Sequence, residues 1–111
     1  MMVSFVEPGS LRTELALEAV TLAEDGAGGH VESWAEVATV FARLEPQRAD
    51  VRFGGDQFLE SVTHRVTLRF RQAVESGMRF RWGERLFEIL TVHDPDETRR
   101  YLICRTREQG R

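Results

Sequence analysis

The sequence predicts an all-β protein: a small antiparallel β-barrel of about six strands, with a long loop and at most a short helix. The first indication is residues 62–71, VTHRVTLRFR, where apolar and polar residues alternate with the period of a half-buried strand. The second is that further short segments of strand-like composition are separated by Gly, Pro and polar residues. The third is that no long amphipathic helix is evident, and closing a sheet of such strands removes its exposed edges.

Residues 62–71 are the strand around which the rest of the chain is organised. The segment is rich in β-branched residues and contains neither Gly nor Pro. The residues expected to face the core are Val62, His64, Val66, Leu68 and Phe70. The residues expected to face solvent or a partner are Thr63, Arg65, Thr67, Arg69 and Arg71.

The first part of the chain predicts a short N-terminal arm, a strand and a loop. The arm, residues 1–9, ends at Pro8 and Gly9. Residues 11–20, LRTELALEAV, alternate weakly and favour a strand, although Glu, Leu and Ala also form helices readily. Residues 24–30, EDGAGGH, contain three glycines and predict a loop between two strands. A phosphate-binding role would need a buried strand before this loop, a helix after it and usually a Lys, and none is evident.

Residues 34–46, WAEVATVFARLEP, predict a strand that is apolar on both faces. One alternating set consists of Trp34, Ala38, Val40, Ala42 and Leu44. The other set consists of Ala35, Val37, Thr39 and Phe41. Such a strand either lies in the wall of a small barrel or is covered on its outer face by a helix or a neighbouring subunit.

Residues 47–61, QRADVRFGGDQFLES, predict the longest irregular connection in the chain. The segment has no steady period and contains Gly54 and Gly55, although residues 56–60 could form a short helical turn. Its length is one at which loops are usually functional or disordered in isolation. We expect it to project from the barrel.

The remaining sequence predicts three more strands. Residues 72–77 turn the chain, and a strand over residues 78–82 places Met78, Phe80 and Trp82 on one face. After a tight break at Gly83 and Glu84, a strand over residues 86–92 resumes. On one face of this strand we expect Phe87, Ile89 and Thr91.

The chain is expected to end with a hairpin. Residues 93–100 form a polar loop with Pro95 at its tip. Residues 101–107 form the last strand, with Leu102 and Cys104 on one face, and residues 108–111 form a tail.

Length and composition predict a single domain over residues 1–111, large enough to bury its own core. The one cysteine, Cys104, excludes an intramolecular disulfide framework and fits a reducing compartment. No apolar run approaches the ~20 residues that span a bilayer, and the N-terminus lacks the pattern of a signal peptide. We therefore expect a soluble protein that is made in the cytoplasm and has no membrane partner.

The charges are distributed unevenly along the chain. Residues 1–47 contain 2 Arg and 8 acidic residues, whereas residues 48–111 contain 13 Arg and 10 acidic residues. All 15 basic residues are Arg, which makes planar, bidentate contacts better than Lys does. The asymmetry is compatible with an ordinary solvated surface. The alternative is that the acidic part of one subunit meets the basic part of the next in a head-to-tail assembly.

No combination of residues predicts an enzyme. His30, His64 and His93 are widely separated, and none lies at metal-ligand spacing with a Cys, Asp or Glu. His64 falls on the apolar face of its strand, which is typical of a hydrogen-bonded core or interface histidine. Cys104 lies in an apolar strand, which is typical of a small core side chain rather than a nucleophile.

The acidic residues of the last loop do not complete a metal site either. Asp94, Asp96 and Glu97 resemble a fragment of a calcium loop but lack its central Gly and distal Glu. We therefore expect no catalytic residues, no metal and no cofactor.

Arginines alternate with aromatic residues in residues 69–71 and 79–82. Single-stranded nucleic-acid-binding proteins stack bases on aromatic rings and contact phosphates with Arg, so a barrel-type single-stranded nucleic-acid-binding module is the alternative function. Alternate residues of a strand point to opposite faces, however. If Phe70, Phe80 and Trp82 lie in the core, no base can stack on them. The outward arginines then remain for a partner's carboxylates or for a DNA backbone passing nearby: Arg65, Arg69, Arg71, Arg79 and Arg81.

The order of these features resembles the phage head-tail joining family, the small connector, stopper or head completion proteins of siphovirus-like particles and gene transfer agents. The resemblance covers residues 9–105. It rests on GSLR before the first strand, the DGAGG loop, Trp34 followed by VATVFARLEP, the VTHRVTLRFR strand, and RLFEILTV followed by a polar turn and YLICR.

The resemblance implies a β-barrel that forms a homo-oligomeric ring, typically of twelve subunits, in the neck of the virion. The ring would join a portal-bound adaptor protein to a tail terminator or tail tube protein, with double-stranded DNA passing through its lumen without sequence specificity. It would assemble in the cytoplasm of the host bacterium. We expect the 47–61 loop to become ordered only in the assembly and to face the channel or an adjoining ring. The loop residues concerned are Arg48, Arg52, Phe53, Gly54, Gly55 and Asp56.

Overall fold

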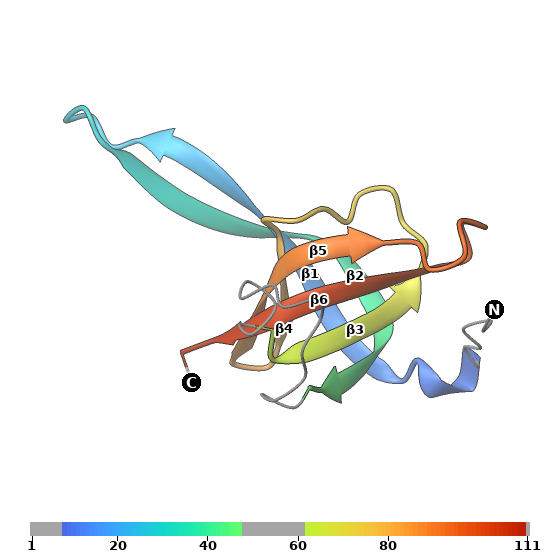
Figure 1. Cartoon of the computed structure of the whole chain (residues 1–111). Coiled ribbons are helices and arrows are strands. Elements are labelled where there is room, and N and C mark those ends of the chain that lie inside the picture. The colour runs from blue at the N-terminus through green and yellow to red at the C-terminus, as the bar shows by residue number, and fades with distance from the viewer. Residues whose placement is uncertain (1–7, 48–61, 111) are drawn as a thin grey trace, which may run out of the picture.

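Six antiparallel strands form a closed barrel in the computed structural model, which describes residues 8–47 and 62–110 (Figure 1). Their order around the barrel is β1-β2-β3-β6-β5-β4, and β4 pairs with β1 to close the sheet. The strands are β1 (Thr13–Glu24), β2 (His30–Pro46), β3 (His64–Arg69), β4 (Arg79–Trp82), β5 (Arg85–His93) and β6 (Tyr101–Gln109). A single 3₁₀ turn, η1 (Pro8–Ser10), precedes β1 in the described part of the chain. The predicted all-β barrel is therefore confirmed.

The core fills the interior of the barrel and receives alternate residues from every strand. From β3 it receives the apolar residues predicted from the sequence, because His64, Val66 and Leu68 are buried. Thr67 is buried as well, although it belongs to the set expected outside. It pairs with Arg43 on β2 and Ile103 on β6, and these larger neighbours flank it on the outer face of the sheet. The largest fully buried side chains are Phe80, Phe87, Leu15, Leu17, Leu68 and Ile89.

Residues 11–20 form a strand from Thr13 onward rather than a helix. Two residues of the segment, Leu15 and Leu17, both point into the barrel and are fully buried, which is the spacing of a strand and not of a helix. β1 pairs with β4 only as far as Glu18, but it continues to Glu24 paired with β2 alone. The outer half of the β1–β2 hairpin, residues 19–35, therefore extends away from the barrel, and we call it the projecting hairpin (Figure 1).

The glycine-rich loop at the tip of the projecting hairpin joins two strands, as predicted. Asp25 Oδ1 accepts hydrogen bonds from the backbone N–H groups of Ala27 (2.8 Å) and Gly29 (3.0 Å). These two bonds hold the pKa of the Asp25 carboxyl below its usual value. Gly26 and Gly28 have φ values of 84° and 88°, which only Gly adopts at little cost. The loop is thus a compact turn built around one carboxylate.

A β-bulge in β2 changes the faces that the sequence predicted. Leu17 pairs with Ala38, but Glu18 pairs with Glu36, so Val37 is an extra residue on β2. Because the bulge shifts the alternation by one residue, Trp34 lies on the face of Glu18. The expectation that Trp34 shares a face with Val40 and Ala42 is therefore wrong.

A second bulge, in β5, has the same effect. Ile89 pairs with Thr106 and Thr91 pairs with Arg105, so Leu90 is the extra residue. Val92 then pairs with the buried Cys104 and packs against the core. The sequence predicted Thr91 on the face of Phe87 and Ile89, and the bulge places Val92 there instead.

The β4–β5 hairpin differs from the prediction at Trp82. Phe80 is fully buried, but Trp82 is 42% exposed because it is the last residue of β4, beside the two-residue turn. Gly83, with φ 63°, takes the first position of that turn, where a type II′ turn requires a positive φ. Arg85, on the far side of the turn, lies over the Trp82 ring at 5.2 Å. Trp82 is therefore not a core residue.

The C-terminal strand is longer than the sequence indicated. β6 runs to Gln109, two residues into the segment expected to be a tail. Glu108 holds this end in place, since its carboxylate accepts hydrogen bonds from Arg85 Nε (2.8 Å) and Nη2 (3.0 Å).

Two predicted segments lie mostly outside the described residues. They are the N-terminal arm up to residue 7 and the 47–61 loop from residue 48 onward. At the start of that loop the backbone N–H of Gln47 donates to the carbonyl of Thr63 (2.8 Å). Among the described residues no helix has the length and apolar character required to cross a membrane.

Candidate interaction surfaces

The projecting hairpin is an exposed two-stranded ribbon. Beyond Glu18 on β1, and before Ala42 on β2, neither strand pairs with a third strand among the described residues. Several large apolar side chains along it are exposed: Val20, Leu22 and Val31. A two-stranded hairpin alone in water is only marginally stable, and an unpaired strand edge is a template for pairing with another chain. The hairpin is therefore a candidate contact surface.

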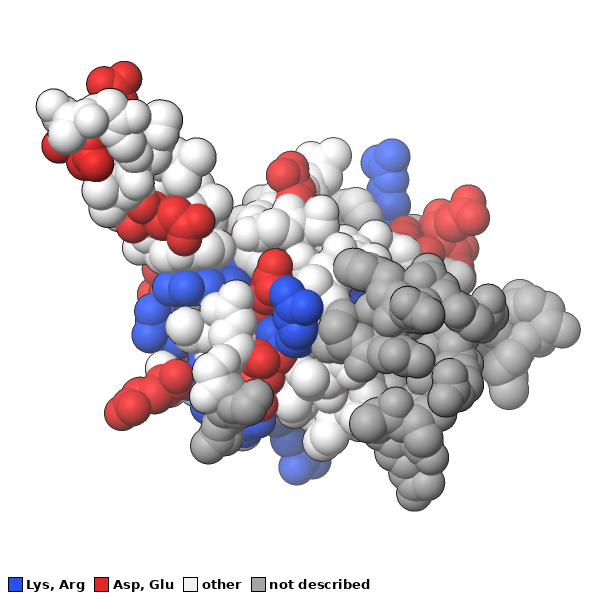
Figure 2. All heavy atoms as spheres, turned by 60° about the vertical axis from the view of Figure 1, so that its left-hand side comes forward, with Lys and Arg blue, Asp and Glu red and all other residues white. Residues whose placement is uncertain are grey.

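The two faces of the projecting hairpin differ in chemistry. Cross-strand pairing places on one face Val20, Leu22, Glu24, His30, Glu32 and Trp34. On the opposite face it places only uncharged and mostly small residues: Ala19, Thr21, Ala23, Val31, Ser33 and Ala35. No Lys or Arg occurs between Arg12 and Arg43, and Figure 2 shows acidic side chains among uncharged ones along the hairpin. The first face is both acidic and apolar.

A cluster of charged residues holds the root of this hairpin against the barrel. Glu18 accepts hydrogen bonds of 2.7 Å from Arg79 Nε and 2.7 Å from Arg81 Nε. The guanidinium of Arg79 also lies 4.0 Å from the centre of the Trp34 ring, a cation–π contact. We call Glu18, Trp34, Arg79 and Arg81 the root cluster. It ties β1 and β2 to β4 at the point where the hairpin leaves the barrel.

Glu18 is ionised in the root cluster although it is buried. Burial by itself would raise the pKa of the Glu18 carboxyl, but the hydrogen bonds and charges of Arg81 and Arg79 outweigh burial and lower it. The hydrogen bond to Glu18 raises the pKa of Arg81 in turn. Both shifts favour the charged forms of Glu18 and Arg81 at neutral pH.

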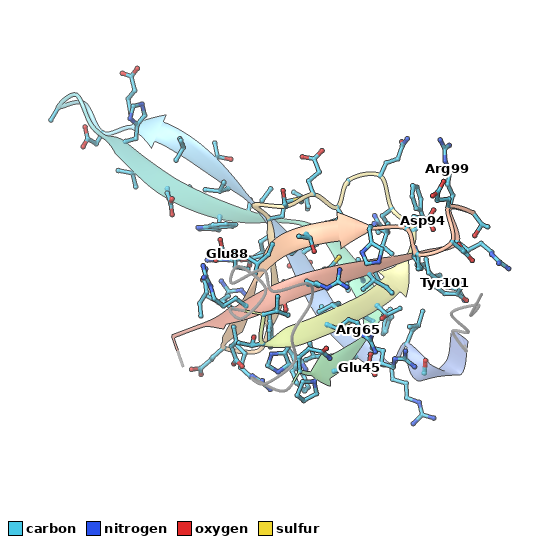
Figure 3. The ribbon with its side chains drawn as sticks, viewed as in Figure 1. Glu45, Arg65, Glu88, Asp94, Arg99 and Tyr101 are labelled. Atoms are coloured by element: carbon cyan, nitrogen blue, oxygen red, sulfur yellow. The ribbon has the colours of Figure 1, made fainter. Side chains whose placement is uncertain are left out.

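The five arginines predicted to contact a partner fall into two groups. Arg79 and Arg81 bind Glu18, and Arg65 donates from Nε to Glu45 Oε1 at 3.1 Å, as the facing side chains in Figure 3 illustrate. Arg69 and Arg71 are exposed and form no ion pair with another described residue. A role of these arginines in subunit contacts stays a prediction, but the structure leaves Arg69 and Arg71 as the pair most available for it.

Arg69 and Arg71 line a groove of about 430 Å³ beside the part of β2 that pairs with the beginning of β1. Its floor is apolar and includes the buried side chains of Leu11, Val40 and Leu68. Phe41 also lines the groove and is 55% exposed, although a side chain of this size contributes about 1.5–3 kcal/mol when it is buried. The groove therefore combines exposed apolar surface with two positive charges.

His64 is a core residue, as its position on the apolar face predicted. Its ring contacts the Phe87 ring edge-on at 5.0 Å, and Nδ1 lies 2.9 Å from Thr63 Oγ1. Burial lowers the pKa of His64, with a smaller contribution from Arg85, while Glu108 acts in the opposite direction. The ring is therefore neutral at pH 7 and has a structural role.

Cys104 and the acidic loop are also structural. Burial raises the pKa of the Cys104 thiol to about 12, so it is not a nucleophile near neutral pH. The Asp94 carboxylate accepts hydrogen bonds from the backbone N–H groups of Glu97 (2.9 Å) and Arg99 (2.7 Å), two residues with positive φ (Figure 3). Asp94 thus shapes a tight turn, and no group of His, Cys, Asp or Glu in the described ranges could hold a metal ion.

The loop residues predicted to contact a ring or channel lie outside the described part of the chain. They are Arg48, Arg52, Phe53, Gly54, Gly55 and Asp56.

The sequence reasoning missed two features that the structure brings together, the root cluster and the groove. The root cluster could have been suspected from Glu18, a charged residue beside the apolar Leu15 and Leu17 of β1. The groove depends on strand order and carries no local signal.

A closed six-stranded barrel with a projecting hairpin and an apolar, basic groove defines a small all-β protein whose surfaces suit contact with other proteins. The chain belongs to the phage head completion protein family, because the model of that family matches residues 6–109. The resemblance inferred from the sequence is therefore confirmed. A comparison with curated proteins finds no match.

Two solved structures are similar to this chain. One is a chain from the virion of a native gene transfer agent particle, with 29% sequence identity and a TM-score of 0.66 over 86% of this chain and 92% of that one. The other is a protein of Shigella flexneri 2a determined in solution, with a TM-score of 0.74 over 95% of this chain and 98% of that one. At 21% identity the second supports the fold alone.

Proposed function

We propose that this protein forms a homo-oligomeric ring, typically of twelve copies, in the neck of a phage or gene transfer agent virion. The ring joins the portal-bound adaptor protein on the head side to the tail terminator or tail tube protein on the tail side. Double-stranded DNA passes through its lumen without sequence specificity. Membership of the phage head completion family supports the structural neck role, and the similar chain in a gene transfer agent virion agrees with it. The function needs neither catalysis nor a cofactor.

The projecting hairpin is the structural feature that best supports assembly into a ring. Its six β1 residues beyond Glu18 reach roughly 20 Å from the barrel at ~3.3 Å per residue. A ribbon of this kind with exposed apolar side chains gains stability when another surface covers it. In a ring, the neighbouring copy would supply the surface that covers the hairpin.

The distribution of charge favours a ring over a closed dimer. The hairpin carries acidic residues and no Lys or Arg, whereas the arginines lie on the barrel, so the two complementary surfaces of one subunit are distinct (Figure 2). A contact between two different surfaces repeats from copy to copy, and it closes into a ring when the rotation between copies divides a full turn. Attraction between the acidic and basic surfaces would also orient the copies as they assemble.

The ring would be part of the virion and would assemble in the cytoplasm of the host bacterium. The DNA in its lumen would be contacted only through its backbone, because transport of a genome requires binding that is independent of sequence. The residues expected at the lumen or at the adjoining ring are those of the 47–61 loop.

Removal of the projecting hairpin tests the proposal. A variant in which an Asn-Gly turn replaces residues 20–34 retains every strand segment that lines the barrel, so we expect it to fold as a monomer. In particles assembled with this variant, negative-stain images should show filled heads without tails, as in particles that lack the protein altogether. Circular dichroism and thermal unfolding of the purified variant confirm that the barrel has formed.

A matched control shortens a part of the chain that we do not assign to a contact. Replacing residues 95–98, in the polar loop between β5 and β6, with a shorter turn should leave head-tail joining intact. Normal tailed particles from the hairpin deletion would show that the hairpin is not needed. Normal tailed particles in the complete absence of the protein would contradict the neck role itself.

A single-stranded nucleic-acid-binding module remains the second candidate, and the exposed Trp82 ring is the observation that favours it. Arg85 lies over that ring, however, and the neighbouring Arg79 and Arg81 are engaged with Glu18. Binding of short single strands that weakens with salt and is lost in Trp82→Ala would support this candidate. We expect neither effect.

A further inference from the structure

We infer that the groove of one subunit binds the projecting hairpin of the next copy, with Leu22 in the groove and the acidic residues Glu24 and Glu32 against Arg69 and Arg71. The inference rests on the proposed ring and specifies the contact that builds it. The structure supplies both halves of the contact on one chain, as two separate surfaces.

The groove lacks an occupant that matches its chemistry among the described residues. Its apolar floor is continuous with the core, Phe41 is exposed at its side, and Arg69 and Arg71 have no carboxylate partner in the described ranges. A suitable occupant therefore has an apolar side chain flanked by carboxylates and carries no positive charge.

One face of the projecting hairpin meets these requirements. Leu22 is 61% exposed and pairs across the ribbon with Glu32, while Glu24 lies two residues further along the same strand and on the same face. The opposite face, with only uncharged and mostly small residues, offers nothing that would pair with an arginine. The charge complementarity thus selects the face as well as the element.

A subunit cannot place its own hairpin in its own groove. Leu22 is eight residues along β1 from Glu14, the residue that pairs with Phe41, a separation of about 26 Å at ~3.3 Å per residue. The root cluster holds the hairpin against β4 and keeps it directed away from the barrel. The occupant must therefore come from a second copy. The barrel is narrow enough, within a molecule of 55 × 31 × 26 Å, for a neighbour's hairpin of roughly 20 Å to reach across it.

Disulfide trapping in assembled particles tests this contact. A disulfide requires two Cα atoms within about 7 Å, so a Leu22→Cys, Phe41→Cys double variant cannot close a bridge within one chain. Both side chains are exposed, so the substitutions should leave the core intact, and the buried Cys104 does not compete. We expect oxidised particles to give a ladder of disulfide-linked multimers on a non-reducing gel. A mixture of the two single variants should give dimers only.

The matched control is Val31→Cys with Phe41→Cys, which places the thiol near the same tip but on the opposite face of the hairpin. It should give no ladder. A ladder from the control equal to that from Leu22→Cys would overturn the assignment of the face. The absence of a ladder from Leu22→Cys with Phe41→Cys, in particles with normally joined tails, would overturn the groove contact while leaving the neck role standing. If another virion protein or residues 1–7 of the same chain fill the groove instead, the ladder should likewise be absent while the tails are joined normally.

Discussion

Glu18, the last residue of β1 that pairs with β4, accepts a 2.7 Å hydrogen bond from Arg79 at the point where the projecting hairpin leaves the barrel. Both side chains are largely withdrawn from water, with 8% of Glu18 and 11% of Arg79 exposed. The same guanidinium covers Trp34 on β2. The ion pair and the ring contact of Arg79 together join β1, β4 and β2 where the hairpin begins, and they are the structural basis of the proposed contact.

Replacing Glu18 with Gln should lower the free energy of unfolding by about 1–3 kcal/mol at pH 7, because two arginines lose a charged acceptor in a largely buried site. The effect should depend on pH. The pKa of Glu18 lies below its usual 4.5 in the folded protein, so its charge stabilises the fold above pH 4.5. This contribution is lost as the pH falls through the folded-state pKa. Urea unfolding of both proteins between pH 7 and pH 3 measures the difference, which should shrink as the pH falls.

A suitable control for that series is Glu45→Gln, which removes an ion pair with Arg65 that is much more exposed. Its effect should be about 1 kcal/mol or less. If Glu18→Gln is no more destabilising than Glu45→Gln at pH 7, the root cluster does not stabilise the hairpin as described.

His64 should make the barrel less stable in mild acid. Its pKa is lowered from 6.5 by burial, so below pH 6.5 the unfolded chain binds a proton that the folded chain does not. The free energy of unfolding should fall as the pH decreases from 6.5 to the folded-state pKa of His64. The loss is about 1.4 kcal/mol for each pKa unit by which the folded-state value lies below the unfolded one. His64→Phe removes the titrating group and retains the ring contact with Phe87. Thermal unfolding between pH 7.5 and 5 should therefore show a smaller loss for His64→Phe than for the wild type, and equal losses would refute this role of His64.

The two large aromatic residues of β4 should respond differently to truncation. Phe80 is fully buried, and Phe80→Ala should cost about 3–5 kcal/mol through lost burial and the cavity left behind. Trp82, at the end of the same strand, is exposed and contacts Arg85, so Trp82→Ala should cost about 1 kcal/mol or less. Denaturant unfolding of the two variants measures both costs. Similar costs would mean that Trp82 packs in the core after all.

Reversing the charge of Arg69 and Arg71 should abolish head-tail joining. Reversing the charge of their proposed acidic partners as well should restore it. Arg69→Glu with Arg71→Glu places like charges against Glu24 and Glu32 of the next copy, which costs several kcal/mol. Counting tailed particles should reveal a decrease of about tenfold or more. Adding Glu24→Arg and Glu32→Arg to the same chain should restore attraction and recover most of the tailed particles. A decrease without recovery would indicate that Arg69 and Arg71 have another partner.

Sequence periodicity predicted the barrel because each strand that lines it must send alternate residues into one core. This rule worked for Leu15 and Leu17, for Val66 and Leu68, and for Phe80. It failed where a single extra residue interrupts pairing, at Val37 and Leu90, because a bulge depends on the partner strand and leaves no mark in the local alternation.

The candidate site was less accessible to sequence reasoning than the fold. The uneven charge along the chain pointed to complementary surfaces, but it could not distinguish Arg79, which binds Glu18, from Arg69, which has no acidic partner among the described residues. Burial at Trp82 was overestimated because a strand pattern does not tell where the barrel ends. These properties depend on which strands become neighbours, and that is decided by the whole fold.

A cryo-electron microscopy reconstruction of the neck in intact particles tests the central claim most directly. The account predicts a closed ring of identical barrels between head and tail, in which each projecting hairpin lies across the barrel of the next copy with Leu22 at the Phe41 groove. A neck without this chain, or a ring in which the hairpins point into solvent and the barrels touch through other surfaces, would contradict it.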